Sequence, residues 1–591
     1  MSDYIPPLKD IRFAMHELAG LGQVLALDAY ADVDADTIDQ VIEEAGNFAR
    51  DVLAPLNVSG DRQGCHVEDR AVRVAEGFAD AYQQFVDSGW QSLPASPVYG
   101  GMGLPEVAAV AASEMWHSAN LSFSLCPLLT SGAITAIEAH GSEALKETYL
   151  PKLVSGEWSG TMVLTEPQAG SDLAAITTKA VPEGDHYRVT GTKIFITWGD
   201  HPMAANTIHL VLARVEGAPE GVRGISMFLV PKFLVNEDGS LGERNDVYPV
   251  SVEHKLGIHA SPTCVMNFGD AGGAVGYLVG EENRGLANMF TMMNHARIEV
   301  GIQGVAISER AYQLARKFAL ERVQGTAHGV VGRATIIHHP DVRRMLLLMK
   351  SQVEAMRAAV SSAGALFDLD SHCADDSERA AASARLALLT PIVKGWLTEV
   401  AQEVTSLGVQ VHGGMGFVEE SGAAQHMRDA RILPIYEGTT GIQANDLAGR
   451  KILGDEGRAI RSLIGDMRAT SELIGSATTL ADIKPGLDEA IDALEIAVDW
   501  LVAAAPYDPT APGAASVNLL MLAGTVLGGW HMARAALAVT ANEGGYDKAF
   551  CDAKLETARF YVAHVLPRSH AYCRAATAGS ERVMTLPADG F

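Results

Sequence analysis

The first part of the chain carries the hydrophobic spacing of helices. Residues 36–55 place apolar side chains at intervals of three and four, which predicts an amphipathic helix. Thr37 and Gln40 resemble a capping box at its start, and Pro55 is expected to end it because proline lacks an amide proton. Helical patterns continue to about Glu157, so we expect an all-helical first region.

The pattern changes between residues 160 and 280. Segments 187–196 and 225–230 are short, rich in β-branched and aromatic residues, and bounded by Gly, Pro and Asp. This composition is typical of strands. The middle of the chain is therefore expected to form a sheet.

Helical spacing returns after the predicted sheet. It runs over 286–322, 341–366 and 380–407, as expected for an antiparallel bundle, and again over 488–505 and 516–541. The chain as a whole is predicted to be an α+β protein in five parts. These parts are an N-terminal extension (1–35), an N-terminal helical domain (36–159), a middle β-domain (160–285), a helical-bundle domain (286–455) and a C-terminal helical extension (456–591).

Charge and composition narrow the possible partners. The formal charge of −27 disfavours nucleic acid and anionic membrane surfaces. Six scattered cysteines without a CxxC motif fit free thiols in a reducing compartment, and the start of the chain shows no apolar secretory signal, so we expect a cytoplasmic protein. The most apolar run, 516–530, is too short to span a membrane, and no metal site is expected.

Two glycine-containing segments carry candidate chemistry, whereas complete GxGxxG, P-loop, HExxH and GxSxG motifs are absent from the sequence. Gly413–Gly416 suits the approach of a phosphate to the backbone, but a tight turn between helices fits equally well. Pro434, Gly438 and Gly441 interrupt the backbone around Glu437. Apolar neighbours would make this carboxylate a better base, although a helix cap or a surface ion pair also explains it.

Five stretches together resemble the acyl-CoA dehydrogenase family in order and spacing. They are Met162–Asp172, Lys193–Gly199, Asn294–Arg297 followed by Arg322, Gln410–Phe417 and Ile435–Thr439. The resemblance implies an N-terminal helical domain, a middle β-domain and a C-terminal four-helix bundle. It also implies the extra C-terminal helical domain of a large subgroup of the family.

The resemblance further implies an FAD cofactor and a set of site residues, with Glu437 as the catalytic base. Positions that match FAD contacts are Met162, Thr165, Gly170, Ser171, Phe195, Thr197, Arg322, Gln410, Gly413, Gly414, Thr439 and Gly441. Positions that match substrate contacts are Ser171, Asn294, Arg297 and Gly438. In the family, the positions of Arg322, Gln410, Gly413 and Gly414 contact the FAD of a neighbouring subunit, which implies a homodimer or a dimer of dimers.

Some of these positions depart from the family or have a simpler explanation. Asn294 stands where many members carry an acid, Gln324–Gly325 replaces a hydroxyl and aromatic pair, and Met415 replaces a frequent asparagine. From the residues alone, Phe195 would be ordinary sheet core.

The activity implied is α,β-dehydrogenation of an acyl-CoA to a trans-2-enoyl-CoA. The α-proton would go to Glu437 and the β-hydride to flavin N5, with electrons passed to an electron-transfer flavoprotein. The resemblance suggests fatty acyl-CoA β-oxidation. It leaves open a 3-methylmercaptopropionyl-CoA dehydrogenase, an acyl-CoA oxidase and a non-catalytic subunit that binds FAD or CoA.

Overall fold

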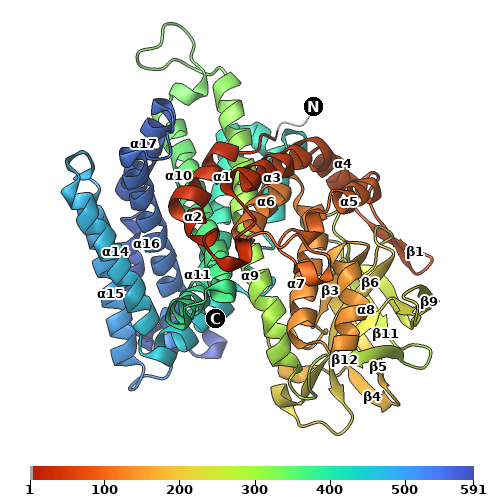
Figure 1. Ribbon diagram of the computed structural model, residues 1–591. Coiled ribbons are helices and arrows are strands. Elements are labelled where there is room, and N and C mark those ends of the chain that lie inside the picture. The colour runs from red at the N-terminus through yellow and green to blue at the C-terminus, as the bar shows by residue number, and fades with distance from the viewer. Residues whose placement is uncertain (1–3) are drawn as a thin grey trace. The chain divides into compact units, whose positions relative to one another are not determined.

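The computed structural model describes residues 4–591, and these divide into two compact units (Figure 1). The first unit consists of residues 44–104 and 115–299. The second consists of residues 4–43, 105–114 and 300–591. Three helices, α3 (Ala35–Phe48), α6 (Glu106–Ala119) and α9 (Gly285–Glu321), belong partly to each unit. The five-part domain division stays a prediction.

The helical part of the first unit differs from the prediction in two respects. Pro55 does not end the helical path: α3 continues through a π-helical turn, Ala49–Leu53, and Pro55 occupies the first turn of α4 (Pro55–Gln63). Proline is tolerated there because the first amides of a helix have no intrahelical acceptor. The region is also not all helical, because a hairpin of β1 (His66–Glu68) and β2 (Ala71–Arg73) follows.

The start of α3 is capped by a residue other than the one predicted. The Asp34 carboxylate accepts from the Thr37 amide at 2.7 Å, so the cap lies three residues before Thr37. The remaining helices of the unit are α5 (Phe78–Asp87), α7 (Leu121–His140) and α8 (Glu143–Val154).

A mixed sheet of eight strands forms most of the non-helical part of the first unit. Its order is β10-β11-β5-β12-β7-β6-β3, with β4 paired to β5 and β6; only the β3–β6 and β4–β6 pairs are parallel. The strands are β3 (Trp158–Val163), β4 (Lys179–Glu183), β5 (His186–Thr197), β6 (Asn206–Val215), β7 (Ile225–Pro231), β10 (Val247–Val252), β11 (Thr263–Phe268) and β12 (Ala274–Leu278). A hairpin of β8 (Phe233–Val235) and β9 (Leu241–Arg244) stands apart from it.

Helix α7 covers the β3 edge of the sheet (Figure 1). Gly160 allows this close approach, because a Cβ there would overlap Ala133 of the helix. The Thr130 hydroxyl accepts from the Gly160 amide at 3.1 Å. The predicted sheet is thus present, and one of its edges is covered by a buried apolar helix.

Long helices make up most of the second unit. The bundle contains the end of α9, α10 (Pro340–His372), α11 (Asp376–His412), α12 (Ala423–Ala430) and α13 (Thr440–Asn445). The chain continues through α14 (Arg458–Ser476), α15 (Lys484–Ala504), α16 (Ala511–Ala541), α17 (Lys548–His564), α18 (Arg568–Ala576) and α19 (Glu581–Met584). The short N-terminal helices α1 (Leu8–Phe13) and α2 (Leu21–Val24) also belong to it.

Helix α16 lies at the centre of this unit and packs on α10, α11, α13, α15, α17 and α18. Trp396 of α11 fits against it because Gly524 has no side chain: a Cβ there would overlap the indole. Gly528 makes the same kind of room for Tyr561 of α17. Helices α7 and α16 are both long and apolar enough to cross a membrane. In their most apolar 18-residue segments, however, 83% and 67% of the residues are buried within the protein.

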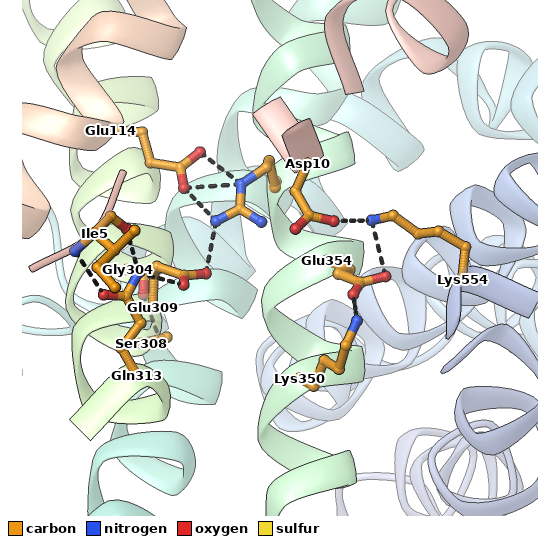
Figure 2. Close-up of polar contacts among 11 residues, drawn as sticks. Ile5, Asp10, Glu114, Gly304, Ser308, Glu309, Gln313, Lys350, Glu354 and Lys554 are labelled. Atoms are coloured by element: carbon orange, nitrogen blue, oxygen red, sulfur yellow. Dashed lines mark hydrogen bonds and ion pairs between the residues drawn. The ribbon is translucent and has the colours of Figure 1, made fainter. Parts of the chain in front are cut away.

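Buried ion pairs attach the N-terminal segment to the helices of the second unit (Figure 2). Lys554 of α17 lies 2.5 Å from Asp10 of α1 and 3.0 Å from Glu354 of α10. Nearby, Arg357 donates to Glu114 at 2.6 and 2.9 Å and to Glu309 at 2.8 Å. Because buried charges are costly unless paired, this network fixes the relative positions of α1, α6, α9, α10 and α17.

Candidate active site

The predicted base lies in an irregular turn between α12 and α13 of the second unit. Glu437 is half-buried and has a φ of 55°, and Gly438 follows with a φ of 91°. Two successive left-handed residues cannot continue a helix, and the first costs on the order of 1 kcal/mol or more because it carries a side chain. Thr439 then caps α13 by accepting from the Ile442 amide at 3.3 Å.

Side chains of α11 hold the backbone of this turn. The buried Lys394 ammonium donates to the Leu433 carbonyl at 2.9 Å, and the Gln402 amide donates to the Ala430 carbonyl at 2.7 Å. The Thr440 hydroxyl donates to the Glu399 carboxylate at 2.5 Å. These contacts bind the segment before and after Glu437 to one rigid helix.

Gly413 and Gly414 lie at the C-terminus of α11. Gly413 ends the helix with a φ of 60°, and Gly413–Phe417 form a short 3₁₀ turn. Both glycines are exposed, and a Cβ on either would meet no atom within 4 Å. Gln410 is also exposed. The segment is therefore both a turn after a helix and an open stretch of backbone that a phosphate or ribose could approach.

Arg322 lies at the same end of the bundle. It directly follows α9, and its carbonyl accepts from the Ile336 amide at 2.8 Å in a hairpin-like loop. The ends of α9 and α11 adjoin, because the rings of Phe318 and His412 are 4.5 Å apart. Gln303, which contacts the Glu437 turn through Tyr436, is roughly 28 Å from Arg322 along α9. The second unit thus gathers its predicted residues into two groups and does not bring Arg322 to Glu437.

The predicted flavin-contacting loop of the first unit is built around a buried ion pair. Glu166 lies between Thr165 and the exposed Gly170 and Ser171, and its carboxylate is 2.9 Å from the Lys193 ammonium of β5. Lys193 also donates to the Leu164 carbonyl at 2.8 Å. The amides and hydroxyls of Thr177 and Thr178 donate to the same carboxylate at 2.5–3.0 Å.

Burial disfavours the charged form of both residues, and the number of hydrogen-bond partners decides how far the pKa of each one shifts. Burial would raise the pKa of Glu166, but Lys193 and the threonine donors lower it to about 2. Lys193 has fewer partners, so burial lowers its pKa to about 8 despite the opposing effect of Glu166. Sequence reasoning assigned no role to either residue. The available signal was a lysine at an inward-facing position of a strand.

A β-bulge on β5 places Phe195 outside the core. Cys264 and Met266 of β11 pair with Ile196 and Lys193, so β5 has one extra residue between these pairs. Phe195 has a φ of 60° and is 57% exposed, which contradicts the expectation of ordinary sheet core. A bulge redirects a side chain in this way, and bulges are frequent beside active sites.

Thr165 and Thr197, two other predicted residues of this group, lie next to the bulge. The Thr165 carbonyl accepts from the Ile194 amide at 2.9 Å, which joins the loop to the bulge. Thr197 ends β5, and Met162 lies on β3; both are half-buried. An accessible aromatic ring beside hydroxyl groups and an open glycine suits a planar, polar cofactor such as a flavin.

Asn294 and Arg297 lie one turn apart on α9, in the first unit. Asn294 is exposed, whereas Arg297 is buried and donates to the Asn294 side-chain oxygen at 3.3 Å. The guanidinium also lies 5.7 Å from the centre of the Phe290 ring. Arg297 thus contacts residues of its own helix, and of this pair only Asn294 offers an exposed side chain.

Comparison with known proteins identifies the family. Family models described as the N-terminal, middle and C-terminal domains of acyl-CoA dehydrogenase match residues 35–157, 161–271 and 283–452. A model described as acetyl-CoA dehydrogenase C-terminal like matches residues 463–587. The chain belongs to the acyl-CoA dehydrogenase family. It is thus an oxidoreductase of the CH–CH group of acyl-CoA in a family that binds FAD, as the motifs predict.

Individual relatives extend over nearly the whole chain. A 3-methylmercaptopropionyl-CoA dehydrogenase of Ruegeria pomeroyi is 50% identical, over 95% of this chain and 96% of the relative. A butyryl-CoA dehydrogenase of Syntrophomonas wolfei is 34% identical, over 100% and 99%. The crystal structure of an acyl-CoA dehydrogenase complexed with FAD from Bacillus anthracis has a TM-score of 0.74, with 21% identity, over 94% of this chain and 90% of that one. The predicted fold, including the extra C-terminal domain, is confirmed.

Proposed function

We propose that Glu437 is the base that removes the α-proton of an acyl-CoA in this enzyme. Support comes from its match to the base position of the family and from its turn, which α11 holds rigidly. A weakly acidic α-proton requires a base held at a fixed distance, and a half-buried carboxylate can still exchange its proton with solvent.

The rest of the reaction follows from the same proposal. Bound FAD supplies the acceptor for the hydride that leaves the β-carbon. The backbone amides of the Glu437–Gly438 turn donate to the thioester carbonyl, where negative charge develops as the α-proton leaves. The α- and β-carbons each lose one hydrogen, and the product is a trans-2-enoyl-CoA.

The two groups of predicted cofactor residues are given separate roles in this proposal. Thr165, Ser171, Phe195 and Thr197 contact the FAD of their own subunit, whereas Arg322, Gln410, Gly413 and Gly414 contact the FAD of a neighbouring copy. The separation of Arg322 from the Glu437 turn along α9 supports this division. At least a homodimer follows, and a dimer of dimers is compatible with it.

We propose 3-methylmercaptopropionyl-CoA as the preferred substrate, because the relative with that activity is 50% identical whereas a butyryl-CoA dehydrogenase is 34% identical. A short fatty acyl-CoA of β-oxidation is the second candidate. Electrons pass to an electron-transfer flavoprotein in a cytoplasmic setting.

The test of the base is flavin bleaching under anaerobic conditions. Glu437→Gln is expected to keep FAD and to lose reduction by every acyl-CoA, with a rate at least 1,000-fold below wild type, equivalent to about 4 kcal/mol. Bleaching at the wild-type rate would refute Glu437 as the base. A wild-type protein that no acyl-CoA bleaches would instead favour a non-catalytic subunit.

The test of the substrate compares 3-methylmercaptopropionyl-CoA with pentanoyl-CoA, which differs only by CH₂ in place of sulfur. At least a fivefold higher kcat/KM for the sulfur compound is expected, about 1 kcal/mol. Equal or higher values for pentanoyl-CoA would favour fatty acid oxidation. Rapid reoxidation of the reduced enzyme by air would indicate an oxidase.

A further inference from the structure

Gln443 lies beneath the two left-handed residues of the Glu437 turn. It is fully buried in α13, and its side-chain amide donates to the Glu437 carbonyl at 3.2 Å and to the Gly438 carbonyl at 3.4 Å. A Cβ on Gly438 would lie 2.6 Å from this amide nitrogen. The glycine therefore leaves room for the Gln443 amide as well as supplying the backbone conformation.

These two hydrogen bonds act on the part of the turn that is most strained. A left-handed residue with a side chain persists only where its surroundings hold it, and the inward carbonyls of such a turn need donors. Gln443 supplies one donor group to both. A Cβ added to Gly395 of α11 would lie 3.3 Å from the Cβ of Gln443. The glutamine is therefore packed against the helix that anchors the turn.

A second contact restrains the other side of Glu437. The Tyr436 hydroxyl donates to the side-chain oxygen of Gln303, which is fully buried on α9. Burial raises the pKa of Tyr436 well above its usual range, and the charge of the adjacent Glu437 raises it further. The residue before Glu437 is thus fixed to α9, and the two carbonyls at and after it are fixed to α13.

We propose that Gln443 is a positioning residue for this reaction, which holds the Glu437–Gly438 backbone so that the Glu437 carboxylate points at the substrate α-carbon. The inference rests on the proposed role of Glu437 as the base. A displacement of about 1 Å at such a group can cost on the order of 100-fold in rate.

The first test variant is Gln443→Met, which removes the donor at similar side-chain volume. With FAD-loaded enzyme and 3-methylmercaptopropionyl-CoA or butyryl-CoA as the probe, flavin reduction is expected to slow by about 10–100-fold, with KM within threefold of wild type. The isotope effect with an α-deuterated probe should increase, because proton removal becomes more rate-limiting. A structural role alone would not increase it.

The matched control is Gln91→Met. Gln91 is also buried, and its amide donates to the Pro127 carbonyl at 3.3 Å and to the Ser131 hydroxyl at 2.9 Å. Its replacement removes an equivalent donor and should leave the isotope effect unchanged. Equal rate losses in both variants, or a wild-type rate and isotope effect in Gln443→Met, would overturn the proposal.

A second variant, Gln443→Glu, keeps the inference testable if the methionine variant does not fold. The new carboxylate repels both carbonyls when ionised and donates to one of them when protonated. Burial should raise its pKa, so its rate relative to wild type at the same pH should recover as pH falls. A constant ratio across pH would contradict the inference. If Glu437→Gln is inactive while both Gln443 variants behave as wild type, this inference alone fails; an active Glu437→Gln would refute the proposed base.

Discussion

Removal of the Lys193 ammonium is the sharpest test of how the flavin-contacting loop is held. Lys193→Met keeps an unbranched side chain, one atom shorter, but leaves the Glu166 carboxylate buried without its ion partner. Loss of one partner from a buried pair costs about 3–5 kcal/mol. The threonine donors continue to satisfy Glu166, so we expect the lower end, about 3 kcal/mol. This corresponds to a fall in Tm of roughly 6–12 °C for a cooperative body of about 150–250 residues.

The pH dependence of this loss has a definite sign. In wild type the pKa of Glu166 falls to about 2, from its usual 4.5, so its stabilising contribution is present above about pH 4.5 and is lost as pH falls toward 2. In Lys193→Met the ammonium no longer lowers that pKa, and protonation removes the buried charge. The difference in stability between the two proteins should therefore be larger near pH 7, where the Lys193 ammonium is still charged, than near pH 5.

Thermal unfolding of the FAD-saturated protein at both pH values measures this difference. Lys179→Met, an exposed lysine of the adjacent β4, is the control and should change Tm by less than about 2 °C. Addition of Glu166→Gln to Lys193→Met should restore part of the loss, since coupled neighbours deviate from additivity by about 0.5–3 kcal/mol. A decrease in Tm of less than about 2 °C for Lys193→Met, or a decrease that is the same at both pH values, would refute the reasoning.

Two further predictions concern the second unit. Arg322→Ala should weaken FAD binding by about 10–100-fold, because it removes a charged hydrogen bond to phosphate. Replacement of an exposed arginine in the same loop, Arg333→Ala, serves as the control. Unchanged flavin occupancy of Arg322→Ala after gel filtration would contradict the cross-subunit contact. Arg357→Met should destabilise the unit by about 3–5 kcal/mol because Glu114 and Glu309 are left buried together. Denaturant unfolding measures this loss of stability, with replacement of the exposed Arg316 by Met as the control. Equal unfolding midpoints for the two variants would show that the ion-pair network contributes little.

Regular elements were predictable because their spacing repeats over many residues. The predicted strands at 187–196 and 225–230 are β5 and β7, and the predicted bundle helices correspond to α9, α10 and α11. The prediction that Pro55 ends a helix is wrong because a proline suits both the end of one helix and the first turn of the next. The sequence does not distinguish the two cases without the geometry of the preceding turn.

The candidate site could be proposed from the sequence only where a local motif carries it. Glu437 and its glycines form one short segment, but Lys394 and Glu399 are anchors that come from a helix far earlier in the chain. The family resemblance predicts Phe195 as an FAD contact, but its neighbours alone give no sign of a bulge and would place it in the core; the extra residue is defined by the pairing with β11. Likewise the strand spacing places Lys193 at an inward-facing position, but its partner Glu166 comes from a loop that only the fold brings to it.

The packing of Trp396 against Gly524 has a consequence for truncated variants of this enzyme. The helix that bears Trp396 also anchors the Glu437 turn, and its indole, only 2% exposed, is covered by a helix that the chain supplies more than a hundred residues later. A shortened version that stops at residue 455 would present this indole and the rest of its apolar surroundings to water. Such a surface favours aggregation over catalysis. The C-terminal extension (456–591) therefore cannot be removed without exposing the core of the bundle. Chimaeras that exchange this extension between relatives should exchange the tryptophan and the glycine together.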